Sequence, residues 1–132
     1  MQDLPHILFV DDDLSILSSI KRNLHRSRIK WKFSYAQSGS AALTLLRESE
    51  KIDVVVTDVM MPGINGYELV QEIRKEYPDI HIIVLSGHCD AEDREEFEKI
   101  HIPFFTKPFP VLDLTTAISL LVNMDNVTYQ PS

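Results

Sequence analysis

Polar side chains stand at the ends of apolar runs in this 132-residue sequence. Two acids follow the run ILFV, one acid ends VVVTD, a serine ends IIVLS and a lysine follows PFFT; these residues are Asp11, Asp12, Asp58, Ser86 and Lys107. Because the carboxyl ends of parallel strands form the binding crevice of an open α/β sheet, we expect the five groups to converge. Taken singly, such residues are more often a helix cap, a turn residue or a solvated cation than part of a site, but their convergence indicates a site.

The three carboxylates determine what such a site could bind. Held close together, Asp11, Asp12 and Asp58 repel one another unless a cation neutralises them. Mg²⁺ suits a site that supplies few carboxylates and leaves room for water and phosphate. Lys107 adds a fixed positive charge and Ser86 a hydroxyl donor, and both groups suit a phosphoryl oxygen. The sequence therefore predicts phosphoryl chemistry assisted by Mg²⁺.

Five short apolar runs have the spacing of strands in one sheet. We expect strands at 6–10, 31–36, 53–57, 81–86 and 102–106. The first, third and fourth are continuously apolar, as central parallel strands covered on both faces would be. The second differs, because Trp31, Phe33 and Tyr35 alternate with polar residues. That alternation predicts a strand at the edge of the sheet.

Amphipathic stretches separate these runs, as in a chain of βα units. Three apolar stripes have helical spacing: the first follows a candidate cap at Asp13, the second follows Ser40 and the third follows Gly66. The stripes are Ile16, Leu17, Ile20 and Leu24; Ala42, Leu45 and Leu46; and Leu69, Val70 and Ile73. We also expect an acidic, thinly anchored helix at 90–100 and a last helix from 110 to about 123.

Composition limits the class of protein. The length and the 44% hydrophobic residues are typical of one globular domain, which we assign to residues 1–124, with a polar tail at 125–132. A net charge of −7 argues against nucleic acid as a direct partner. The single cysteine, Cys89, cannot build a disulfide framework and fits a reducing cytoplasm. The N-terminal MQDLPHILFVDDD has neither the basic flank nor the apolar length of a signal peptide or membrane anchor.

In four motifs the sequence resembles the receiver domain of two-component response regulators. They are ILFVDDD, VVVTDVMMPGINGYEL, IIVLSG and PFFTKPF, in the order and at the spacing of that family, within residues 5–123. The resemblance implies a flavodoxin-like (βα)5 fold, a three-layer sandwich with a parallel five-stranded sheet of order 2-1-3-4-5. It also implies a signalling domain that promotes its own phosphoryl transfer and dephosphorylation, not an enzyme acting on a separate substrate.

The resemblance assigns a role to each site residue. Asp58 is expected to accept a phosphoryl group from a phosphohistidine on a sensor histidine kinase or a phosphotransfer protein. Asp12 and Asp58 would supply carboxylate ligands to Mg²⁺ and Met60 a backbone carbonyl, whereas Asp11 would act largely through a bound water. Lys107 would contact Asp58 or the phosphoryl group, and the bond from Lys107 to Pro108 is expected to be cis.

The resemblance further implies a conformational output. Ser86 would move toward the phosphoryl oxygens and allow the ring of Phe104 to turn inward, although threonine and tyrosine are commoner at these two positions. The surface at residues 90–122 would then form a homodimer or bind an output partner. There Leu112, Leu120 and Val122 supplement a core stripe of Val111, Leu114, Ile118 and Leu121.

Two other interpretations remain. In a haloacid-dehalogenase-like phosphatase, Asp11 would be the nucleophile, Asp13 the acid/base, and Ser86 and Lys107 the phosphate ligands. That reading leaves Asp58 and the MMPGINGYEL loop without a role, and the chain is short for that family. A receiver-like scaffold that is never phosphorylated is disfavoured because every acidic residue of the pocket is present.

Overall fold

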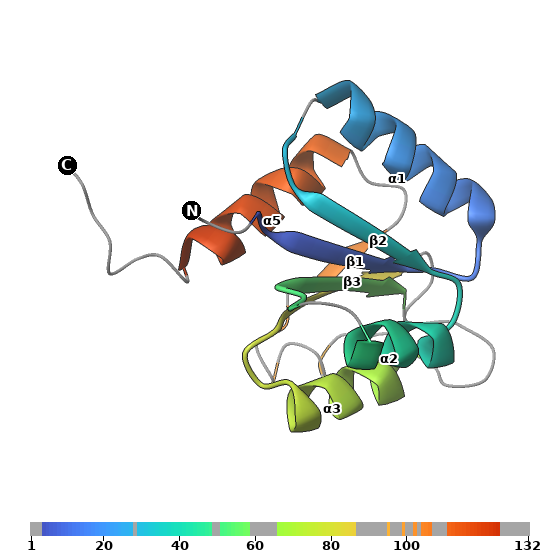
Figure 1. The fold of residues 1–132 in the computed structure, drawn as a ribbon, viewed down its shortest axis with the longest axis vertical. Helices are drawn as coiled ribbons and strands as arrows, with labels where there is room; N and C mark the ends of the chain where they lie inside the picture. Colours follow the sequence, from blue (N-terminus) through green and yellow to red (C-terminus); the bar gives the residue numbers. More distant parts are fainter. Residues whose placement is uncertain are drawn as a thin grey trace.

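The sheet has the predicted parallel topology. The computed structural model describes residues 4–27, 29–48, 51–58, 66–86, 95, 99, 102, 104–106 and 111–124. Its strands are β1 (His6–Val10), β2 (Lys32–Ala36), β3 (Val54–Asp58), β4 (His81–Ser86) and β5 (Phe104–Thr106). All neighbouring strands are parallel, and they lie in the order β2-β1-β3-β4-β5. Both the fold class and the edge position of β2 are therefore confirmed (Figure 1).

Helices cover both faces of the sheet. They are α1 (Leu14–Ser27), α2 (Gly39–Glu48), α3 (Gly66–Glu76) and α5 (Val111–Met124). Figure 1 shows α1 and α5 above the sheet and α2 and α3 below it, which gives three layers. The acidic helix predicted at 90–100 falls outside the described residues, apart from Glu95 and Lys99, which are both helical and exposed. None of the described helices is long and apolar enough to cross a membrane.

Alternation along β1 and β3 gives each face of the sheet its own core. Leu8, Val10 and Val55 belong to the core between the sheet and the helices α2 and α3, together with Ala42, Leu46, Leu69, Val70 and Ile73. Ile7, Phe9, Val54 and Val56 belong to the core beneath α1 and α5, together with Leu17, Ile20, Leu24, Leu114 and Ile118. Burying one such side chain contributes about 1.5–3 kcal/mol. The two cores together hold the ends of the central strands in place.

Hydrogen bonds set where two of the helices begin. The Ser15 backbone N–H and hydroxyl both donate to Asp13 Oδ1, over 2.9 and 2.6 Å, so Asp13 caps α1 as predicted. For α2 the predicted start after Ser40 is wrong. The Ala41 N–H donates to Ser38 Oγ over 3.0 Å, so Ser38 is the cap and the helix begins at Gly39.

Three strand boundaries also differ from the prediction. The second and fifth strands begin later, at Lys32 and Phe104. The third is shifted by one residue and spans Val54–Asp58. Its shift has a local cause, because Asp53 Oδ2 accepts the His6 N–H over 2.9 Å, while Asp58 pairs with Leu85 and so belongs to the strand.

The helix α5 tests the predicted division between core and surface. Leu114 and Ile118 are fully buried and Leu121 is partly buried, which confirms that part of the stripe, whereas the side chains of Val111 and Leu112 lie outside the description. Leu120 is 62% exposed, as expected. Val122 was expected in the outward set, but it packs against the core. It follows Ile118 by four residues and therefore shares its face of the helix.

Candidate functional site

The structure brings three of the predicted site residues together. One carboxylate oxygen each of Asp11, Asp12 and Asp58 lie within 4.8 Å of one another. The register explains the proximity, because Val10 of β1 pairs with Thr57 of β3 and the acids follow these two residues. Among the described residues, these three acids lie close enough together to hold a metal ion. We call it the acidic cluster.

Backbone contacts hold the acidic cluster in place. The Asp11 N–H donates to the carbonyl oxygen of Ala36 over 3.0 Å, which ties it to the end of β2. Asp11 Oδ1 in turn accepts the Asp13 N–H over 2.9 Å. Beside Asp58, the Thr57 hydroxyl donates to the Asp58 carbonyl oxygen over 3.1 Å. Asp58 is therefore held by the strand that carries it, and Asp11, directly after β1, is held by its contacts with Ala36 and Asp13.

Burial within the acidic cluster is uneven. Asp11 is 2% exposed and Asp58 is 6% exposed, while Asp12 is open to solvent. Two buried carboxylates so close together are unfavourable without a nearby positive charge. Hard oxygen ligands, few in number and reached from solvent past Asp12, fit Mg²⁺ better than Zn²⁺, which favours nitrogen and sulfur. The residues present therefore fit the ion that the sequence predicts.

The other predicted site residues are described only in part. The backbone of Ser86 ends β4 beside Thr106 of β5, at the same edge of the sheet as Asp58, and Phe104 begins β5. Their side chains are not described. Met60, Lys107 and Pro108 fall outside the described residues, so the roles assigned to them and the cis bond remain predictions.

Sequence reasoning missed the contribution of Thr57. This residue is fully buried, and its hydroxyl reaches the Asp58 carbonyl oxygen. A threonine at the end of an apolar strand is ordinary, since threonine favours strands, so its type gave no signal. Only its position directly before the buried acid sets it apart.

Comparison with known proteins agrees with the geometry. The model of the response regulator receiver domain family matches residues 7–119. The heme response regulator HssR of Staphylococcus aureus is 36% identical over 122 residues, which cover 91% of this chain and 52% of the relative. This chain thus spans about half the length of that curated relative.

Two solved structures with the same fold are described as receiver domains. A response regulator receiver domain protein from Clostridium thermocellum superposes with a TM-score of 0.85 at 31% identity, over 95% of this chain and 99% of that one. The signal receiver domain of an HD domain-containing protein from Pseudomonas fluorescens gives a TM-score of 0.84 at 25% identity, over 94% and 98%. With the family match covering most of the residues, the chain belongs to the response regulator receiver domain family.

Proposed function

We propose that this receiver domain is switched by phosphorylation of Asp58. The observation that carries the proposal is the acidic cluster, in which Asp58 is buried at the end of β3 with its carboxylate within 4.8 Å of those of Asp11 and Asp12. The donor is a phosphohistidine of a sensor histidine kinase or a phosphotransfer protein. In the step, the P–N bond of the donor breaks, an O–P bond to Asp58 forms, and the imidazole leaves.

The chain contributes mainly position and charge to this step. Strand β3 holds Asp58 in place, and only 6% of this residue is exposed to solvent. When Mg²⁺ is bound, it neutralises the carboxylates and the phosphoryl oxygens. Asp12 and Asp58 would hold it through carboxylate oxygens, Met60 through its carbonyl oxygen and Asp11 through a water.

The remaining roles extend from this centre. Lys107 is proposed to contact the phosphoryl group, Ser86 to donate its hydroxyl to it, and Phe104 to turn inward in response. The chain itself then promotes both transfer and loss of the phosphoryl group. The surface at 90–122 is the proposed site of homodimerisation or output binding; its described part includes the exposed Leu120.

Two further assignments complete the proposal. Residues 1–124 are proposed to form the folded unit and 125–132 a polar tail. We place the protein in the cytoplasm, without direct nucleic-acid or membrane partners, because its single cysteine suits a reducing compartment and a sensor kinase would meet it there.

Labelling with a small phosphoryl donor tests the proposal. Acetyl phosphate or phosphoramidate with Mg²⁺ should add one phosphoryl group, read by the intact mass, and Asp58→Asn should remove the labelling. Asp13→Asn is the matched control, because Asp13 lies next to the cluster but caps α1, and asparagine caps a helix equally well. Equal labelling of the wild type and Asp58→Asn would contradict the proposal.

The same experiment separates the phosphatase interpretation. A phosphoryl group trapped on Asp11 instead of Asp58 would favour that class. The geometry gives it little support, because its supposed acid/base, Asp13, directs Oδ1 to the N–H and hydroxyl of Ser15. Family membership also favours the receiver.

A further inference from the structure

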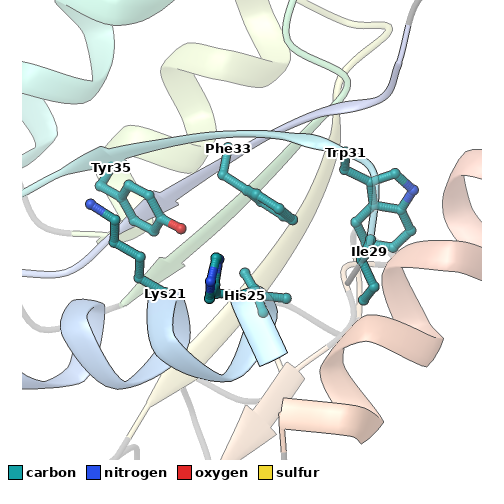
Figure 2. A pocket seen from close by; sticks show the side chains of 7 residues that line it. Lys21, His25, Ile29, Trp31, Phe33 and Tyr35 are labelled. Atoms are coloured by element: carbon teal, nitrogen blue, oxygen red, sulfur yellow. The ribbon is translucent and has the colours of Figure 1, made fainter. Parts of the chain in front are cut away.

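A groove lies between α1 and the edge strand β2, apart from the acidic cluster. Its volume is about 630 Å³, within the range of sites that bind ligands. Lys21 and His25 line it from α1, and Trp31, Phe33 and Tyr35 line it from β2 and the residue before it. Figure 2 shows the three aromatic side chains on the side of β2 that faces α1, with Lys21 and His25 opposite them. We call this the α1–β2 groove.

The aromatic side of the groove is firmly held. Phe9, almost fully buried in the next strand, stacks on Tyr35 with ring centroids 5.7 Å apart and lies 6.1 Å from Phe33. Trp31 in turn lies 6.3 Å from Phe33. The three groove rings are nevertheless only half-buried. They therefore offer apolar surface that loses little side-chain freedom when it is covered.

The segment of the chain that forms the groove is positively charged. Residues 14–47 contain seven lysines and arginines and no aspartate or glutamate, so this segment carries +7 and leaves −14 for the rest of the chain. Lys21, Arg22, Arg26 and Lys30 are exposed, and the structure records no ion pair between them and another described residue. Lys21 Nζ lies 5.7 Å from the centre of the Tyr35 ring, at the groove itself. The surroundings of the groove favour an anionic partner.

The outer edge of β2 adds hydrogen-bonding groups. The Lys32 N–H donates to Pro5 and the Ala36 carbonyl accepts from Asp11, so these residues direct their backbone toward β1. By alternation, Phe33 and Tyr35 direct their N–H and C=O away from it. Within the described part of the chain, β2 is an end strand of the sheet with no strand on that side. An extended peptide can pair with such an edge.

We propose that the α1–β2 groove binds an extended acidic peptide segment that carries an aromatic or apolar side chain. The segment adds to the edge of β2, its apolar side chain lies on the rings of Trp31 and Phe33, and an acid of the segment faces Lys21. A nucleic-acid strand could also stack on these rings. A nucleic acid, however, lacks the alternating N–H and C=O groups that could hydrogen-bond to the edge of β2. The charge of −14 on the rest of the chain also repels a long polyanion.

Trp31 provides the measurement, because it is the single tryptophan of the chain. The full chain is titrated with a short acetylated peptide of alternating glutamate and phenylalanine, and the Trp31 emission is followed. A saturable change is expected, and the same peptide with lysine in place of glutamate should bind far more weakly. The variant Lys21→Glu should weaken binding on the order of tenfold, because it reverses the charge that faces the acids of the peptide.

Controls separate the parts of the proposal. Lys75→Glu makes a similar charge change on an exposed position of α3, on the other face of the sheet, and should leave binding unchanged. The peptide N-methylated along one edge should bind weakly because it cannot pair with β2, and this readout requires no variant to fold. Equal binding of the N-methylated peptide, or equal weakening by Lys75→Glu, would overturn the proposal.

Other occupants give distinct results. Tighter binding of oligothymidylate than of the acidic peptide would assign the groove to nucleic acid. Saturation by phenylacetate at the same concentration as the peptide would assign it to small aromatic anions. A Trp31 signal that depends on protein concentration alone would assign it to a second copy of the chain, and each of these results overturns the proposal. The measurement does not involve Asp58, so its outcome is independent of the phosphorylation proposal.

Discussion

The acidic cluster and the α1–β2 groove differ both in the sign of their charge and in the burial of the charged side chains. Asp11 and Asp58, at the ends of the central strands β1 and β3, are buried and held by backbone contacts. The cations beside β2 lie on an exposed helix next to half-buried rings. Central strands can hold a few atoms at fixed distances, whereas an edge strand offers area and a free row of backbone groups. The first arrangement suits an ion and a phosphoryl group, and the second suits a chain.

The largest expected effect distinguishes the two regions by their need for Mg²⁺. Omitting Mg²⁺ should reduce the labelling of the chain by acetyl phosphate to background, because the charge of the ion is then missing from beside the three carboxylates and the incoming phosphoryl group. The charge-reversed groove variant Lys21→Glu should label like the wild type when Mg²⁺ is present. Full labelling in the presence of EDTA would mean that the acidic cluster does not act through a metal.

The buried ring of Phe9, against which the groove rings pack, should matter more for stability than an exposed side chain. Phe9 is 1% exposed and contacts the rings of Phe33 and Tyr35, so Phe9→Ala should lower the free energy of unfolding by about 3–5 kcal/mol. Leu120→Ala, at a position 62% exposed, should change it by no more than about 0.5 kcal/mol. Urea unfolding followed by circular dichroism measures both. Similar losses in the two variants would show that Phe9 and the groove rings are not a packed unit.

The contrast between the regions also explains what the sequence could and could not predict. The continuous apolar runs were enough to predict the central strands, because a strand covered on both faces needs apolar residues throughout. The acids that follow these runs were then expected to meet, because parallel strands end at the same edge of the sheet. The acidic cluster was therefore predictable from Asp11, Asp12 and Asp58. The boundaries of the helices were less predictable. The start of α2, for example, depends on whether the hydroxyl of Ser38 or that of Ser40 accepts the Ala41 N–H.

The groove was not predicted, although its residues were noticed. The alternation of Trp31, Phe33 and Tyr35 correctly indicated an edge strand, but alternation does not show what lies opposite those rings. That depends on how α1 crosses the sheet and brings Lys21 and His25 to the same space. The net charge of −7 also gave no sign of the +7 carried by residues 14–47, because a single sum over the chain does not show how charge is distributed along it.

A smaller effect concerns repulsion within the acidic cluster. Without Mg²⁺, Asp58→Asn should raise the free energy of unfolding on the order of 1 kcal/mol, because it removes one of three like charges within 4.8 Å. Addition of Mg²⁺ should stabilise the wild type and have less effect on the variant. Urea midpoints with and without Mg²⁺ give both values. A loss of stability in Asp58→Asn without Mg²⁺ would mean that the fold already compensates this charge.

The smallest effect tests whether the phenol of Tyr35 is partly shielded from solvent in the groove. Burial raises the pKa of Tyr35 above its ordinary value of 10.0, because the phenolate would lose solvation. Between pH 10 and that raised pKa, the unfolded chain releases the proton and the folded chain retains it. The contribution of Tyr35 to stability is therefore complete below about pH 10 and is lost as the pH rises beyond it.

The matched variant for this measurement is Tyr35→Phe, which keeps the ring beside Phe9 and removes the ionisation. Its urea midpoint should fall less steeply above pH 10 than that of the wild type, while other tyrosines and lysines contribute equally to both and cancel. A difference titration at the absorbance of phenolate should show one group ionising late. Parallel stability curves would place the Tyr35 hydroxyl in water, and the groove would then present a more polar surface to a bound peptide than its rings suggest.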